Sequence, residues 1–267
     1  MSLAEVLSLA ACGAFAGLLG GLFGIGGGVV VVPALYAVFG QMGVADAERM
    51  KLAVGTSLAT IIVTSARSLS GHARSGLVDW GVLRVWGPFI ALGALGGAAL
   101  ARVVAADALT TLFAVGILAI AIQRIGGRRR ARPGARLPSL PAQAMLGAGT
   151  GLVSALMGIG GGVIGVLLLT AFGRSVHAAV ATAAGFGLVI ALPGAVGFML
   201  AGQGADVPPG SVGYVNLAGF ACVAALSALT APMGARLAHR LPADALSRAF
   251  AGYLAVTGVL LLREALA

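Results

Sequence analysis

An internal repeat constrains this chain more than any other feature of its sequence. Residues 13–35 and 147–169 match at 13 of 23 positions without a gap, and both copies contain Gly-Ile-Gly-Gly-Gly. Two further pairs of blocks recur in the same order: AVGTS and AVATA at 53–57 and 179–183, and LARVVAADAL and LAHRLPADAL at 100–109 and 237–246. The chain is therefore predicted to contain two copies of one folding unit.

Both copies are too apolar for a protein that folds in water. Of the 267 residues, 59% are hydrophobic and 9% are charged, whereas a soluble domain carries about 25% charged residues. Apolar runs of about 20 residues are long enough to cross a bilayer as helices. We therefore predict an all-α polytopic membrane protein whose surrounding medium is the lipid bilayer.

Each half begins with a Gly-interrupted apolar segment, residues 3–40 and residues 142–172. As one helix the first would be about 57 Å long, at about 1.5 Å per residue, against a hydrocarbon core of about 30 Å. Each segment is therefore expected to fold back at GIGGG as a helical hairpin with a short second leg. Three ordinary spans are predicted to follow in each half: 52–71, 84–103 and 108–124, then 178–200, 213–237 and 245–263.

A polar, Arg/Pro-rich linker, residues 125–141, separates an N-terminal repeat (1–124) from a C-terminal repeat (142–267). Lys and Arg accumulate on the cytoplasmic side of membrane proteins. With the linker inside, the inner loops hold 13 of the 17 Lys and Arg and the outer regions hold four. We predict a multi-pass protein of the inner cell membrane with a cytoplasmic linker.

The same count predicts inverted-topology repeats. Each half has an odd number of crossings beyond its hairpin, so the two halves insert in opposite orientations, as in many secondary transporters. The net charge of +9 does not indicate nucleic acid, because it comes mostly from one arginine cluster and no basic face carries aromatic residues. We therefore exclude nucleic acid as a partner.

The two GIGGG segments are the predicted binding site for a small anionic substrate near the membrane midplane. Glycines leave backbone N–H groups bare, and the helix that follows directs its free N–H groups and positive dipole end at the break. Close packing of helices by small residues is the alternative, but repetition at equivalent breaks favours a site. The candidate residues are Gly26, Gly27, Gly28, Gly160, Gly161 and Gly162.

Hydroxyl side chains and one arginine complete the predicted site. Thr56 and Ser57 lie inside an apolar span, and Thr182 occupies the position that matches Thr56. Their hydroxyls suit an oxyanion, although a bond to the carbonyl one turn back is the alternative. Arg67 is placed to neutralise an anion or, as we favour, to reach the inner lipid headgroups.

Catalytic and metal chemistry find no support in the sequence. The nearest feature to a serine protease site, Ser70-Gly71-His72, lies at a span end without an oxyanion loop. The histidines are far from the cysteines, so no metal site or cofactor is expected. All eight acidic residues lie at span ends or in loops, so no carboxylate is placed as a proton relay. A transporter is predicted, with an anion channel as the alternative and an intramembrane enzyme as a weaker one.

At these residues the sequence resembles the TauE/SafE family of sulfite and organosulfonate exporters. GIGGG followed by Pro33-Ala34-Leu35 is similar to the family's opening motif, and the segment from Ala53 to Leu58 is similar to its A-x-G-T-S block. The second half departs from the pattern at Leu167, where Pro is expected, and at Ala183, where Ser is expected. The resemblance implies an exporter of sulfite or organosulfur anions.

Overall fold

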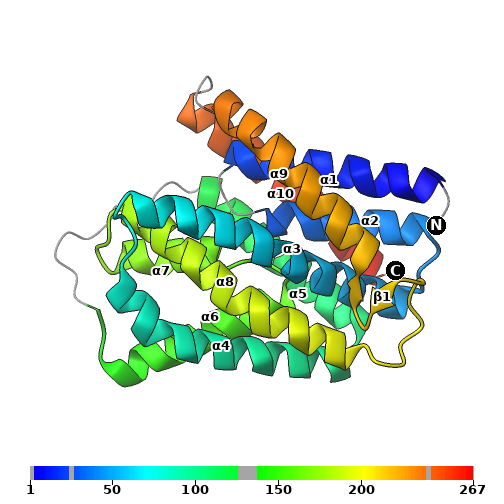
Figure 1. Ribbon diagram of the computed structural model, residues 1–267, viewed down its shortest axis with the longest axis horizontal. Coiled ribbons are helices and arrows are strands. Elements are labelled where there is room, and N and C mark those ends of the chain that lie inside the picture. Colours follow the sequence, from blue (N-terminus) through cyan, green and yellow to red (C-terminus); the bar gives the residue numbers. More distant parts are fainter. Residues whose placement is uncertain (1–2, 24–26, 126–136, 239–241, 267) are drawn as a thin grey trace.

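The computed structural model describes residues 3–23, 27–125, 137–238 and 242–266. These residues form ten helices and one short antiparallel ribbon (Figure 1). Most of the predicted linker, residues 126–136, lies outside the described residues. The elements are α1 (Leu3–Phe23), α2 (Gly28–Gln41), α3 (Asp46–Arg74), α4 (Trp80–Val103), α5 (Ala106–Ile125), α6 (Leu140–Leu156), α7 (Gly162–Ala171), α8 (Val176–Ala201), β1 (Ser211–Val212), β2 (Val215–Asn216), α9 (Leu217–Ala238) and α10 (Ala243–Leu266).

Seven helices in the described part of the chain are long and apolar enough to cross a membrane: α1, α3, α4, α5, α8, α9 and α10. Three apolar helices, α2, α6 and α7, have only 10 to 17 residues. The prediction of an all-helical, multi-pass protein is therefore confirmed at the level of helix content. The short helices α2 and α7 occupy the predicted second legs of the two hairpins.

The helices break where the glycines are. Helix α1 ends at Phe23 and α2 begins at Gly28, and α6 ends at Leu156 and α7 begins at Gly162. Gly27 at the first break has φ +80° and Gly158 at the second has φ +60°, in the left-handed region that a side chain disfavours. Figure 1 shows α2 lying beside α1, so the chain reverses direction at the first break.

The first leg of each hairpin packs against the other half of the molecule. Helix α1 lies along α9, and its counterpart α6 lies along α4, the counterpart of α9. A Cβ atom added to Gly21 would lie 2.0 Å from the carbonyl oxygen of Ala231, and one added to Gly151 would lie 2.0 Å from that of Ile90. Small residues therefore let the backbones of these helix pairs approach closely.

Helices α3 and α8, which occupy matching positions in the two halves, form the centre of the core. They pack against each other and run in opposite directions along the long axis of the molecule (Figure 1). Every residue from Lys51 to Ile61 on α3 is buried. Both breaks pack against this antiparallel pair, because α2 contacts α3 and α7 contacts α8.

Candidate functional site

The two helix breaks meet in the buried interior. A Cβ atom added to Gly28 would lie 2.8 Å from the carbonyl oxygen of Gly158 and 3.0 Å from Cα of Ile159. The hydroxyl of Ser57 on α3 donates a hydrogen bond of 2.9 Å to the same Gly158 carbonyl. The start of α2, the middle of α3 and the turn before α7 therefore converge at one place.

A cavity of about 70 Å³ lies next to this junction, at the N-terminus of α7. It is large enough for a few water molecules or one small anion. Helix α3 contributes hydroxyl groups, the second break contributes backbone, and α8 contributes small side chains. The lining residues are Thr64, Ser65, Ser68, Gly160, Gly162, Val166, Val180, Ala183, Ala184 and Gly187.

The lining of this cavity offers hydrogen-bond donors but contains no charged side chain. Ser65 is 9% exposed, and its hydroxyl has no hydrogen-bond partner among the described residues. The first-turn amides of Gly162 and Val163 likewise have no acceptor in the described chain. Unpaired amides and the positive end of the helix dipole at such a terminus favour a negative ligand. No acidic or basic side chain lines the cavity.

The glycine at position 187 keeps the hydroxyl of Ser65 accessible. A Cβ atom on Gly187 would lie 2.4 Å from Oγ of Ser65, closer than two such atoms can approach. The backbone amide nitrogen of Gly161 is 3.9 Å from the same position. Gly187 therefore leaves the space that Ser65 and the start of α7 share.

The opposite end of α3 is closed by aromatic and charged side chains. The rings of Phe198 and Tyr214 are in edge-to-face contact, with centroids 6.5 Å apart. Nζ of Lys51, which is 9% exposed, lies 5.7 Å from the centroid of the Tyr214 ring. Burial raises the pKa of the Tyr214 phenol, and the hydrogen bond to Glu48 raises it further. The phenol is therefore a neutral donor over the physiological pH range.

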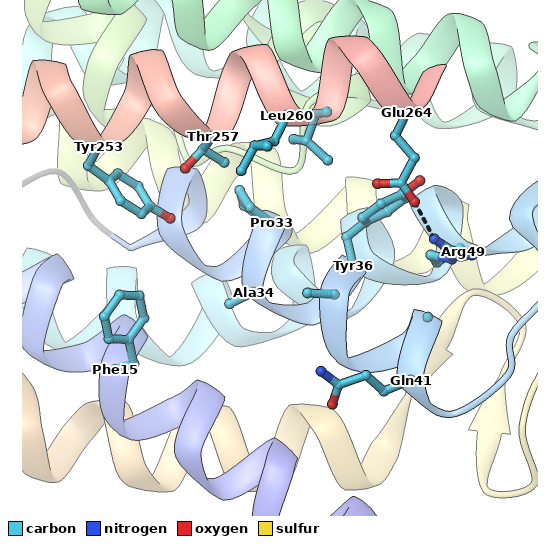
Figure 2. A pocket seen from close by; sticks show the side chains of 13 residues that line it. Phe15, Pro33, Ala34, Tyr36, Gln41, Arg49, Tyr253, Thr257, Leu260 and Glu264 are labelled. Atoms are coloured by element: carbon cyan, nitrogen blue, oxygen red, sulfur yellow. Dashed lines mark hydrogen bonds and ion pairs between the residues drawn. The ribbon is translucent and has the colours of Figure 1, made fainter. Parts of the chain in front are cut away.

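A larger hollow of about 580 Å³ lies elsewhere, between α1, α2 and α10 (Figure 2). Its walls are mostly apolar or aromatic, including Phe15, Pro33 and Tyr253, and Phe15 is 48% exposed. The cation at its end, Arg49, is paired with Glu264 at 2.6 Å and with Asp46, and it stacks over an aromatic ring. Its charge is thus already compensated, and an apolar groove open between helices suits lipid chains better than an anion.

The comparison with known proteins decides the family. Residues 9–261 match the family model described as sulfite exporter TauE/SafE. The chain belongs to the TauE/SafE family.

The similarity to relatives extends over most of the chain. A "probable membrane transporter protein" of Haemophilus influenzae is 31% identical over 249 residues, which are 92% of this chain and 94% of that relative. Another of Methanocaldococcus jannaschii is 29% identical over 206 residues, or 77% and 76% of the two chains. No solved structure gives a significant match.

The glycines of the TauE/SafE motifs have different surroundings in the structure. Gly160 and Gly162 line the cavity. Gly161 caps α7 and packs against Phe186, whose Cβ would lie 2.6 Å from an added Cβ. Gly27 caps α2, and Gly28 lies where the two breaks meet. Gly26 lies outside the described residues.

The threonines of the TauE/SafE motifs form a matched pair of contacts between helices. Oγ1 of Thr56 accepts a hydrogen bond from the backbone N–H of Asn216 at 3.0 Å, and Oγ1 of Thr182 accepts one from that of Asp79 at 2.9 Å. Asn216 and Asp79 in turn cap α9 and α4 through their own side chains. Both threonines are fully buried and do not line the cavity. Their hydroxyls hold the starts of matching helices in the two halves.

The remaining predicted residues lie outside the cavity, while three unpredicted hydroxyls line it. Ser57 bonds to the second break, and Arg67 is exposed on α3 and is not part of the lining. Thr64, Ser65 and Ser68 are not among the residues predicted from the sequence. A signal for them exists, because 64 and 68 are one helical turn apart and place their side chains on one face.

Proposed function

We propose that this TauE/SafE protein is a secondary transporter that exports a small oxyanion of the sulfite or organosulfonate class. The observation that carries the proposal is the cavity at the start of α7. There, the unpaired amide of Gly162 and the unpartnered hydroxyl of Ser65 belong to a lining that contains no charged side chain. Such a site replaces the hydration shell of an anion with fixed donors. A neutral site also releases its ligand more readily than a buried cation would.

The direction follows from the proposed topology. If the Arg-rich linker is cytoplasmic, α3 runs from the outer face to the inner face. The cavity residues Thr64, Ser65 and Ser68 then lie on the inner half of α3, and Ser68 is exposed. The other end of α3 is covered by Tyr214 and Phe198. A cavity on the inner half of α3, with aromatic side chains over the outer end of that helix, suits a protein that collects its substrate from the cytoplasm.

The proposed membrane arrangement is a pair of inverted repeats around this site. It is supported by the antiparallel course of α3 and α8 (Figure 1). It is also supported by the packing of α1 against α9 and of the matching helix α6 against α4, because in each pair one helix comes from each half. Transporters with inverted repeats place their sites near the midplane, where broken helices meet. The inner cell membrane is the proposed location.

Binding and flux of the purified protein test the proposal. Sulfite, thiosulfate, taurine, sulfoacetate and acetate are titrated against the detergent-solubilised protein, and stabilisation by at least one sulfur oxyanion is expected. Gly187→Ala should abolish that stabilisation, because its Cβ occupies the space beside Ser65. Gly96→Ala is the matched control, since no atom lies within 4 Å of the position of its Cβ. Equal binding by both variants would contradict the assignment of the cavity.

Counterflow in proteoliposomes separates a carrier from a channel. If the protein is a carrier, proteoliposomes loaded with unlabelled sulfite should transiently accumulate labelled sulfite above its concentration outside. A channel lets the label only equilibrate. Saturating flux with counterflow is the expected result.

A further inference from the structure

The two breaks contain similar groups, and the cavity at the start of α7 lies at the second of them. At the second break, the start of α7 faces Ser65 and Gly187. At the first break, the start of α2 and the hydroxyl of Ser57 lie close together around the Gly158 carbonyl. Both breaks thus place a hydroxyl near a helix N-terminus, but the hydroxyl of Ser57 already donates to the Gly158 carbonyl.

The two breaks differ at two positions on the central helices. In the alignment of AVGTS with AVATA, Gly187 on α8 corresponds to Ile61 on α3, and Ser65 corresponds to Ala191. The matching hydrogen bonds of Thr56 and Thr182 support this alignment in space. The cavity at the second break is therefore lined by a glycine and a serine, whereas the matching positions carry isoleucine and alanine.

The side chain of Ile61 lies between the two breaks. Its Cδ1 would be 3.0 Å from a Cβ atom on Gly28, and its Cγ2 would be 3.2 Å from one on Gly160. Gly160 belongs to the cavity wall, whereas Gly28 is the first residue of α2. Ile61 is 1% exposed. It occupies the space between the cavity wall at Gly160 and the start of α2.

We propose that Ile61 is the barrier residue of the transport path, which separates the cavity at the second break from the groups at the first. The inference rests on the proposed function, because it assigns a path to the same cavity. A branched apolar side chain offers an anion no hydrogen bond, and a bare anion is costly to hold there. The anion therefore passes from the cavity to Ser57 and the start of α2 only when Ile61 moves.

Cysteine reactivity tests this barrier without any substrate. In a Cys12→Ala, Cys222→Ala background, Ser65→Cys reports on the cavity and Ser57→Cys reports on the far side of Ile61. Inside-out vesicles are treated with the anionic reagent 2-sulfonatoethyl methanethiosulfonate. Ser65→Cys should react quickly and Ser57→Cys slowly. Adding Ile61→Ala should accelerate the reaction of Ser57→Cys about tenfold or more, which corresponds to a barrier lower by about 1.4 kcal/mol.

Ile62→Ala is the matched control, because it removes the same side chain from the neighbouring position of α3 without opening the space between the breaks. Ile61→Val removes a single methylene and is the milder change, so it should fold if Ile61→Ala does not and should give an intermediate rate. Fast reaction of Ser57→Cys with Ile61 intact would overturn the proposal. The proposal would also be overturned if Ile62→Ala accelerated the reaction of Ser57→Cys as much as Ile61→Ala does, or if neither Ile61 variant accelerated it. Absence of sulfite binding would instead refute the proposed function and leave the reactivity result to decide on Ile61.

Discussion

The hydroxyl groups of α3 differ in what they contact, and this decides what each can do. Ser57 donates to the Gly158 carbonyl, and Thr60 donates to the carbonyl of Ser57 in its own helix. Ser65 has no partner in the described chain although it is 9% exposed. Since Ser65 lines the cavity, its hydroxyl can donate a hydrogen bond to a ligand there.

Ser65→Ala should therefore weaken anion binding without unfolding the protein. A hydrogen bond to a charged ligand contributes about 1.5–3 kcal/mol, so the Kd for sulfite should rise by about 10- to 100-fold. Isothermal titration of the detergent-solubilised protein measures the change. Ser70→Ala is the control, because Ser70 is an exposed residue of α3 whose hydroxyl bonds to the Ala66 carbonyl. An unchanged Kd in Ser65→Ala would remove Ser65 from the site.

The repeat in the sequence predicts two glycines that line the cavity but none of its hydroxyls. Repetition of GIGGG identified Gly160 and Gly162, which line the cavity. Ser65 has no serine at the matching position of the other half, because Ala191 stands there. Repetition therefore favours Thr56 and Thr182 as site residues. In the structure, each of these threonines accepts a hydrogen bond from the residue before a helix of the other half. A repeated residue in a two-fold structure is as easily a structural contact as a ligand contact.

At the scale of elements, Thr56 and Thr182 fix the positions of α9 and α4. Thr56→Val or Thr182→Val should each destabilise the protein by about 1–3 kcal/mol, because each leaves a buried backbone N–H without its acceptor. The melting temperature in detergent should fall in both variants. Thr→Ser at either position should restore most of the loss.

Thr110→Val is the matched control for the threonine pair. Thr110 is equally buried, but its hydroxyl donates to the Ala106 carbonyl one turn back in its own helix. Its removal leaves no backbone N–H unpaired, so a smaller drop in melting temperature is expected. A drop as large as that of Thr56→Val would show that volume or polarity, not the inter-helix bond, determines the effect.

The close contact between α4 and α6 predicts a sharp difference between two glycines on one helix. Gly151→Ala should destabilise the protein by about 1–3 kcal/mol, because the added Cβ would lie 2.0 Å from the Ile90 carbonyl. Gly149→Ala should be neutral or slightly stabilising, since nothing lies within 4 Å of its Cβ position. Thermal unfolding of the two variants in detergent measures the difference. Similar melting temperatures would contradict the close approach of these helices.

Element positions followed from the sequence because apolar length and glycine breaks report directly on helices. The predicted spans 84–103 and 108–124 correspond to α4 and α5. The predicted span 52–71 is shorter than α3, because Asp46, Glu48 and Arg49 form its first turns despite their charges. Those charges are stabilised by contacts such as the ion pair of Arg49 with Glu264, 215 residues away, which no local pattern contains.

At the scale of the whole molecule, inverted insertion predicts that matching loops lie on opposite membrane faces. The loops after α3 and α8 are equivalent in the repeat, and Ser75 and Gln203 are exposed in them. In the Cys12→Ala, Cys222→Ala background, Ser75→Cys should react with an impermeant maleimide in inside-out vesicles and Gln203→Cys in right-side-out vesicles. Reaction of both from the same face would mean that the two halves insert in the same orientation.

The absence of charged side chains from the cavity lining predicts that transport depends on the membrane potential. Because no charged side chain lines the cavity, a bound anion carries its full charge across the membrane, and export should respond to the membrane potential. With the interior negative, each negative charge moved outward gains about 2.3 kcal/mol per 100 mV, an equilibrium concentration ratio of about 50-fold. Labelled sulfite in proteoliposomes under a potassium diffusion potential, at equal pH and without sodium, should approach this ratio. Gly187→Ala should abolish the response, whereas Gly96→Ala should retain it. Flux that ignores the potential and requires a pH gradient would show that a proton accompanies the anion.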